Sequence, residues 1–215
     1  MTDSRYIKAL ELIDAAHADD PRKIMIAKNT QPASDRSVSG HPEEPALVER
    51  PYELVYAERM SKWLDLVAPE ASIPLKLAVR AQHLRRWETP RESYPMDKAG
   101  YHAWRTGLKN RQANRASQLI IEAGFEESIA DRVAALIRKE NLKEDKDTQA
   151  LEDTTCLVFL GYYLDDFSKK YKNDDDLVRI IAKTWKKMSA RGHALTVELD
   201  LSDHTKSLVE RALSE

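Results

Sequence analysis

The sequence has little of what a disulfide-bonded, membrane-embedded or β-rich protein needs. Its 215 residues include one cysteine, three phenylalanines and six glycines. The single cysteine excludes an intramolecular disulfide, and no apolar run approaches the roughly 18 residues of a membrane-spanning helix. The first five residues lack the apolar segment of a secretory signal peptide. We therefore expect a cytoplasmic protein without a membrane span.

Short catalytic motifs are missing as well. The chain has no glycine-rich phosphate loop, no CxxC pair and no HExxH motif, so the chemistries that depend on them are excluded. The lone thiol, Cys156, lies in the apolar run 156–160, where burial would keep it protonated and inert. A functional site must therefore be built from residues on separate elements.

The residues that are present favour helices. Charged residues make up 33% of the chain and hydrophobic residues 42%, and apolar side chains recur with helical spacing in several segments. The clearest of these segments are 5–18, 52–67, 126–140 and 148–167. Ser72 and Pro74 predict the start of a helix over 72–87, and Gly124 predicts the end of a helix over 97–123. Together these segments predict an all-α domain of about seven helices.

Residues 27–51 interrupt this pattern. They show no periodicity and include four prolines, so we expect a long N-terminal loop or arm and not a packed element. The chain length fits a single domain over 1–215. Within it we expect a helical core over 52–164 and a C-terminal helical extension over 165–215.

Charge is distributed unevenly along the chain. Residues 80–115 hold nine Lys or Arg against three Asp or Glu, which gives +6, so the remainder carries −8 of the overall −2. Such asymmetry indicates that an anion meets this region, although a solvated basic face is the other interpretation.

His83 is the first candidate for a catalytic residue. On a helix over 72–87 it shares a face with Arg80, Arg86 and Trp87, at positions i−3, i+3 and i+4. This face joins positive charge to an aromatic wall. The alternative is a core histidine with satisfied hydrogen bonds.

Polar residues on three later helices add to the candidates. Arg105 and Lys109, four residues apart, form a second polar line, for which a solvated stripe is the alternative. Glu140 and Asp153 extend apolar stripes at helix ends, so we expect both to point inward. Because burial of an unpaired carboxylate costs several kcal/mol, ion pairing and a role in a site are the two explanations. We favour pairing for Glu140 and a site for Asp153.

Over about 52–164 the order of parts resembles the HD superfamily of helical phosphohydrolases. The segment 77–83 resembles that family's buried helix ending in His-Asp, and 129–137 and 151–153 resemble its later helices and distal aspartate. The resemblance implies an HD-like core, catalytic roles for His83 and Asp153, and divalent metals that activate water. Leu84 replaces the aspartate after the histidine, and 56–60 contain no histidine. Most of the usual metal ligands are therefore absent.

Motifs in 80–91, 100–105, 151–160 and 184–189 resemble, more closely, a widespread family of uncharacterised proteins that is described as a domain of unknown function. Some members carry a glutamyl-tRNA synthetase label. The only similar element here, 187–189, lies in a periodic helix without a nucleotide-binding context. Synthetase activity is therefore not expected.

These observations lead to two functional hypotheses. The first is that the protein binds a small phosphorylated or anionic ligand and, if it is an enzyme, hydrolyses it with His83 as general acid or base oriented by Asp153. The ligand-binding candidates are Arg80, Arg86, Trp87, Arg91, Arg105, Lys109 and Glu140. No metal ligand is assigned, and the cofactor and oligomeric state are left open.

The second hypothesis is a catalytically inactive HD-like scaffold. It would bind a protein or an RNA through its basic aromatic face, by stacking on bases and contacting phosphates. The sequence pI near 6.3 favours a small ligand over general nucleic-acid binding.

Overall fold

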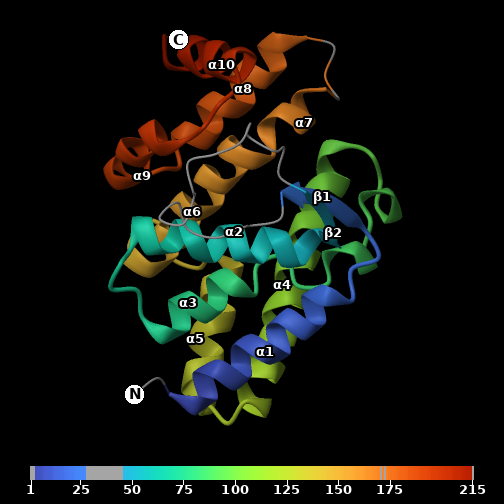
Figure 1. Cartoon of the computed structure of the whole chain (residues 1–215), viewed down its shortest axis with the longest axis vertical. Coiled ribbons are helices and arrows are strands. Elements are labelled where there is room, and N and C mark those ends of the chain that lie inside the picture. Colours follow the sequence, from blue (N-terminus) through green and yellow to red (C-terminus); the bar gives the residue numbers. More distant parts are fainter. Residues whose placement is uncertain (1–2, 28–45, 170, 172, 215) are drawn as a thin grey trace, which may run out of the picture.

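The computed structural model describes residues 3–27, 46–169, 171 and 173–214, and these are almost entirely helical (Figure 1). The α-helices are α1 Ser4–Ala18, α2 Tyr52–Val67, α3 Ile73–Arg80, α4 Lys98–Glu122, α5 Glu127–Arg138, α6 Lys146–Tyr162, α7 Leu164–Ser168, α8 Asp174–Trp185, α9 Ala190–Ala194 and α10 Asp203–Ser214. Short 3₁₀ helices are η2 Arg86–Glu88, η3 Arg91–Ser93 and η4 Leu195–Glu198. The predicted all-α class is confirmed. The described residues hold more helices than expected, chiefly because α7 and α9 are separate five-residue helices.

Local capping explains several helix ends. The side chain of Ser72 accepts a hydrogen bond from the Leu75 backbone N–H and begins α3, as predicted, with Pro74 in the first turn. Asp97 caps α4 in the same way. Gly124, with φ of 95°, follows the end of α4 in the left-handed conformation that glycine adopts without strain.

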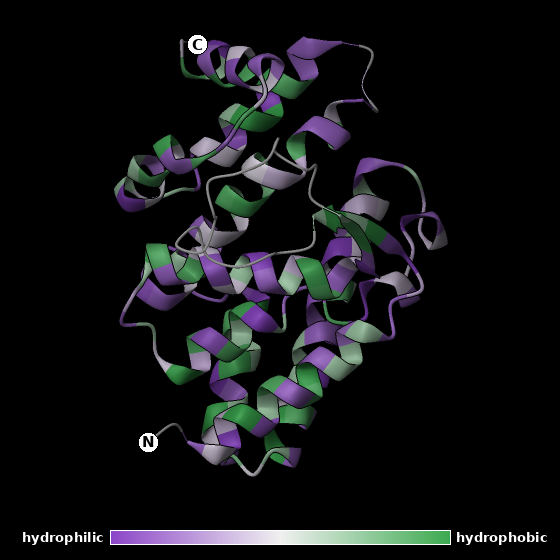
Figure 2. Ribbon diagram, viewed as in Figure 1, coloured by the Kyte–Doolittle hydropathy of each residue, from purple (hydrophilic) through white to green (hydrophobic). Residues whose placement is uncertain are grey.

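The helices pack around α2, which contacts α1, α3 and α6. Buried apolar side chains form one cluster that extends from Ala9 in α1 to Ala212 in α10. Each helix mixes hydrophobic and hydrophilic residues (Figure 2), and no helix among the described residues is long and apolar enough to cross a membrane. Helices α8 and α10 pack on each other beyond α6 and α7 (Figure 1).

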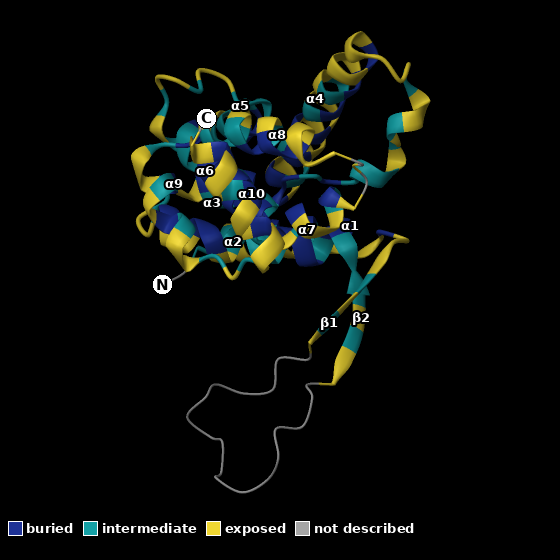
Figure 3. Cartoon of the chain, turned by 90° about the horizontal axis from the view of Figure 1, so that it is seen from above, coloured by how far each residue is buried: buried dark blue, intermediate teal, exposed yellow. Residues whose placement is uncertain are grey.

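A β hairpin projects from the helical body (Figure 3). Its strands, β1 Lys23–Ala27 and β2 Leu47–Pro51, pair antiparallel with Lys23 opposite Pro51. The prediction that 27–51 forms a long loop or arm and not a packed element therefore missed the strand at 47–51. Pro51 is the last residue of this strand, a position that tolerates a residue without a backbone N–H. The rest of the predicted loop, 28–45, lies outside the described residues.

The helix predicted over 72–87 ends early, at Arg80. Beyond it His83 and Arg85 adopt left-handed backbone conformations, with φ of 63° and 51°, and no α-helix continues through such residues. The predicted common face of Arg80, His83, Arg86 and Trp87 is therefore wrong. The residues of this turn point in different directions, and that separation shapes the candidate site.

Candidate functional site

His83 lies in the turn after α3 and packs against α2. Its imidazole stacks on the ring of Tyr56, with centroids 4.1 Å apart and planes inclined by 14°. The Tyr56 side chain is buried, whereas the His83 side chain is 23% exposed. Solvent therefore reaches an imidazole that is otherwise surrounded by protein.

Two charged groups face the imidazole from opposite sides. Arg86 Nη1 lies 2.7 Å from Nε2, and Glu53 Oε2 lies 3.4 Å from Nδ1. A guanidinium only donates hydrogen bonds, so Nε2 is the acceptor and the ring proton is on Nδ1, facing the Glu53 carboxylate. The arrangement holds a neutral imidazole in one tautomer, with a carboxylate behind it.

Glu53 is held by the segment before the hairpin. Its side chain is only 1% exposed, and Oε1 accepts a hydrogen bond from Arg22 Nη2 at 2.5 Å. The carboxylate of Asp20 accepts from the backbone N–H of Glu53 and from Arg22, and so caps the start of α2. These contacts fix the carboxylate against His83.

Burial lowers the pKa of His83 to about 4, assisted by the positive charges of Arg86 and Arg105 and opposed by Glu53. The imidazole is therefore neutral near pH 7. Burial also lowers the pKa of Arg86, and Arg105 lowers it further. Among the described residues Arg86 has no carboxylate partner, and its guanidinium instead lies 5.0 Å from the centre of the Trp104 ring.

Positive charge continues from Arg86 along α4 and onto neighbouring helices. We call Arg86, Arg105, Lys109, Lys139 and Lys187 the basic cluster. Burial lowers the pKa of Lys109, and Lys139 and Arg105 lower it further. For Arg105 no hydrogen bond or ion pair is found in the described part of the chain.

One acid stands within the basic cluster. Glu152 on α6 is 6% exposed; its carboxylate pairs with Lys139, and Oε1 lies 3.8 Å from Lys187 Nζ. The basic cluster therefore has Glu152 at one end and His83 at the other. The cluster carries more positive than negative charge.

Three predicted ligand-binding residues lie apart from His83. Arg80 forms a two-bond ion pair with Asp14 of α1, at 2.6 and 2.7 Å. Arg91 donates to backbone carbonyls of the loop before α4, at Tyr94, Pro95 and Asp97. Trp87 is half-buried beside the Arg85 guanidinium. The first two support structure, because each side chain satisfies a local partner.

The two predicted acids also differ from expectation. Glu140 is 51% exposed and lies 3.6 Å from Arg138, because Lys139, with φ of 59°, ends α5 and turns the next residue outward. Its predicted inward direction is wrong. The prediction that Asp153 orients His83 is wrong too: its carboxylate accepts from the Ser189 backbone and hydroxyl and from Gln149, and the acid at His83 is Glu53.

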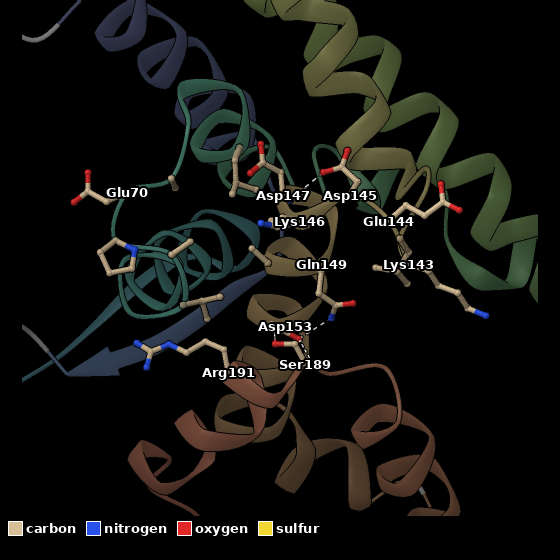
Figure 4. A pocket seen from close by; sticks show the side chains of 17 residues that line it. Glu70, Lys143, Glu144, Asp145, Lys146, Asp147, Gln149, Asp153, Ser189 and Arg191 are labelled. Carbon is tan, nitrogen blue, oxygen red and sulfur yellow. Dashed lines mark hydrogen bonds between the residues drawn. The ribbon is translucent and has the colours of Figure 1, made fainter.

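Asp153 lines a separate cavity of about 570 Å³ between the loop after α2, the start of α6 and α9. Figure 4 shows Asp153 in the wall of this cavity, where its carboxylate accepts hydrogen bonds from Gln149 and from Ser189. Gly192 of α9 approaches so closely that a Cβ there would lie 2.9 Å from the Asp153 carboxyl carbon. This aspartate joins α6 to α9.

The metal site implied by the HD resemblance does not fit these residues. Residues 56–60 of α2 contain no histidine, and Tyr56 there is buried and stacked on His83. In the described ranges no group of three or more His, Cys, Asp and Glu side chains is arranged to hold a metal ion. We therefore derive no step through a metal.

Sequence reasoning missed Glu53 and Glu152, although each carried a signal. Glu53 stands three and seven residues before Tyr56 and Met60, on the apolar stripe of α2. Glu152 stands four residues before Cys156, on a buried face of α6. An acid in line with apolar residues is the pattern that would have found both.

The comparisons with known proteins place most of the chain in one family. No curated protein and no solved structure matches it, so the resemblance to the HD superfamily stays a prediction. The model of one family matches residues 7–209. The chain belongs to the family described as Domain of unknown function (DUF4202).

Proposed function

We propose that the protein binds a small phosphorylated or otherwise anionic molecule at the basic cluster, beside His83. The observation that carries this proposal is the convergence of Arg86 and Arg105 on a neutral imidazole. Both guanidinium groups lower the pKa of His83. Among the described residues neither is within ion-pairing distance of a carboxylate, although Glu53, across the imidazole, raises the pKa of Arg86. An anion would supply the missing negative charge.

The energetics favour an anion at this place. Burial lowers the pKa of Arg86 most, and the positive charge of Arg105 lowers it further. Burial also weakens the screening of the repulsion between the two guanidinium groups by water. A phosphate group between them would accept paired hydrogen bonds from each planar guanidinium. Such charge-assisted bonds contribute about 1.5–3 kcal/mol each.

The aromatic residues favour a small ligand over RNA. Trp104 is only 7% exposed, and its Nε1 donates to the Thr89 carbonyl at 3.0 Å. Tyr56 is buried under His83. Stacking on bases would use the rings of the basic aromatic segment, and only Tyr101 among them is exposed, at 45%; the others are Trp87, Tyr94 and Trp104. Buried rings form the wall of a small-ligand site, whereas stacking on bases requires exposed faces.

If the bound molecule reacts, hydrolysis of a phosphate ester fits the arrangement best. The bound anion would draw the Arg86 guanidinium away from His83 Nε2, and the freed lone pair would take a proton from water as the water oxygen attacks phosphorus. The ester P–O bond would break, and the imidazolium, stabilised by Glu53 through Nδ1, would return the proton to the leaving alkoxide. A bound anion would raise the pKa of His83 from about 4 towards neutrality, where a general base is effective. Arg86 and Arg105 would stabilise the phosphoryl oxygens.

Isothermal titration tests binding directly. Inorganic phosphate, nucleoside monophosphates and sugar phosphates are titrated into the wild type, into Arg105→Gln and into Arg179→Gln. Arg179 is the matched control because it is an exposed arginine on α8 that pairs only with Asp176. We expect Arg105→Gln to weaken binding about 10-fold and Arg179→Gln to leave it unchanged.

Two results would count against the proposal. One is that none of these phosphates binds the wild type. The other is that Arg105→Gln binds as tightly as the wild type. Hydrolysis is tested separately, with phosphate esters and the His83→Gln variant; loss of turnover with phosphate binding retained would assign chemistry to the imidazole.

A further inference from the structure

A second, smaller cavity lies between α4 and the turn 84–89. Its volume is about 240 Å³. The charged residues in its lining are Arg85, Arg111, Arg115 and Glu88, which sum to +2. Neither His83 nor Arg86 lines it, so it is distinct from the site proposed above.

Two arginines that are adjacent in the chain contribute to the two different sites. Arg86 contacts His83 and the Trp104 ring, whereas Arg85 pairs with Asp19 and Glu88 and lines the cavity. The left-handed backbone at Arg85 gives the two side chains their different directions. Glu88 is the single acid of the lining, and Arg85 Nη1 already bonds it at 2.8 Å.

Two buried donors in this lining have no hydrogen-bond partner among the described residues. They are Gln112 Nε2 and Arg85 Nε. Gln112 is 6% exposed, in the middle of α4. An unpaired buried donor is unfavourable. Both residues line the cavity, so rotation of their side chains towards it would pair the two donors with an acceptor that the described residues do not provide.

The exposed arginines of the cavity are also available. Arg111 reaches only the Tyr94 hydroxyl, at 3.5 Å, and Arg115 has neither an ion pair nor a hydrogen bond within the described ranges. Guanidinium groups together with a carboxamide offer N–H donors from several directions. A tetrahedral phosphate group matches this set better than a planar carboxylate.

We propose that this cavity binds a phosphate monoester group of a small molecule, at a site separate from the basic cluster. Its volume is below the roughly 300–1,000 Å³ of sites that enclose a whole drug-sized ligand. The cavity therefore holds the phosphate group, and the remainder of the molecule extends into solvent. Arg111 and Arg115 hold the anion, and the Gln112 carboxamide donates to it.

The test is a phosphate titration that is monitored by nuclear magnetic resonance and by calorimetry. Inorganic phosphate is added to ¹⁵N-labelled wild type, and the side-chain amide signal of Gln112 is assigned by its loss in Gln112→Met. We expect this signal to shift on titration in the wild type and in Arg105→Gln. In Arg115→Gln the same shift should need about 10-fold more phosphate. Arg115 is exposed, so its replacement does not disturb the core, and Arg179→Gln serves as the control.

The two proposals fail separately. Equal phosphate affinity of Arg105→Gln and the wild type in the calorimetric titration, with the Gln112 signal still shifting, would overturn the basic cluster and leave this cavity. An unmoved Gln112 signal, or equal titration of Arg115→Gln and wild type, would overturn the cavity. Acetate binding as tightly as phosphate would overturn the assignment of a phosphate group, as would binding of a single-stranded RNA without binding of phosphate.

Melting temperature gives a second measurement. Gln112→Met removes the unpaired donor while keeping the side chain's length. Without phosphate we expect this variant to unfold at a temperature equal to or higher than that of the wild type. On addition of phosphate its melting temperature should rise less than that of the wild type. A lower melting temperature with an unchanged phosphate response would contradict the proposal.

Discussion

The carboxylate that faces His83 belongs to Glu53, thirty residues earlier in the chain, with Oε2 3.4 Å from Nδ1. A buried acid so close would ordinarily favour the charged imidazole. Here burial and the Arg86 guanidinium on the opposite edge outweigh it, and the pKa falls. The protonation state of His83 is therefore decided by a balance of opposite charges.

The lowered pKa of His83 predicts a loss of stability in mild acid. An unfolded histidine takes up a proton near pH 6.5, whereas folded His83 does so only near pH 4. The unfolded state therefore binds more protons between these values, and stability falls as pH falls through this window. We expect the wild type to lose about 2 kcal/mol from this group between pH 7 and pH 5, measured by urea unfolding.

The His83→Gln variant is the control for that measurement, because it cannot titrate. Its stability should fall less over the same range. A remaining dependence is expected from His17, whose pKa is also lowered by burial. Equal slopes for the wild type and His83→Gln between pH 7 and pH 5 would show that His83 is not held neutral.

Removal of the Glu53 charge should destabilise the protein and lower the pKa of His83 further. Glu53→Gln leaves Arg22 with one acid where it had two. Because Arg22 is 46% exposed and keeps Asp20, we expect a loss of about 1–3 kcal/mol, the cost of a weakened charge-assisted hydrogen bond. The matched control is Glu58→Gln, since Glu58 is 38% exposed and pairs with Arg50; its effect should stay within about 1 kcal/mol. Urea unfolding gives the stabilities, and an NMR titration of His83 gives the pKa. A raised pKa in Glu53→Gln would contradict the geometry.

Local signals predicted the helices well. Ser72 and Pro74 begin α3 as expected, and Gly124 follows α4 as expected. Capping and periodicity involve residues within a turn of one another, so a single sequence contains all the information that they need.

Local signals of this kind could not predict the turn after α3. Nothing in Arg80 to Trp87 resembles a helix stop, yet His83 and Arg85 adopt left-handed conformations. The stacking on Tyr56 and the contact with Arg86 offset their cost, and these depend on α2 lying alongside. The partners of Glu53 and Asp153 could not be predicted for the same reason, because Arg22 donates to Glu53 and the Ser189 backbone N–H donates to Asp153 from distant segments.

Asp153 should matter for stability and not for anion binding. Its carboxylate, 2% exposed, accepts from Ser189 and Gln149 and anchors α9. Asp153→Ala leaves the Ser189 backbone N–H without its partner, so we expect a loss of about 2–4 kcal/mol in urea unfolding. Phosphate titration of the folded variant should give the wild-type affinity. A large loss of phosphate affinity at unchanged stability would show that this aspartate takes part in anion binding.

Glu152 offers the opposite test, in which removal of a charge improves binding. It is the one acid that contacts Lys139 and Lys187 in the basic cluster, so Glu152→Gln makes the cluster more positive. We expect phosphate to bind about 5-fold more tightly at low ionic strength, with the gain shrinking in high salt because screening shortens the reach of the added charge. Stability should fall, since Lys139 is only 14% exposed and loses its partner. Glu210→Gln, at an exposed position on α10, is the control for the change in overall charge. Weaker or equal binding in Glu152→Gln would mean that the acid positions the lysines for the ligand, and that excess positive charge alone is not what attracts the anion.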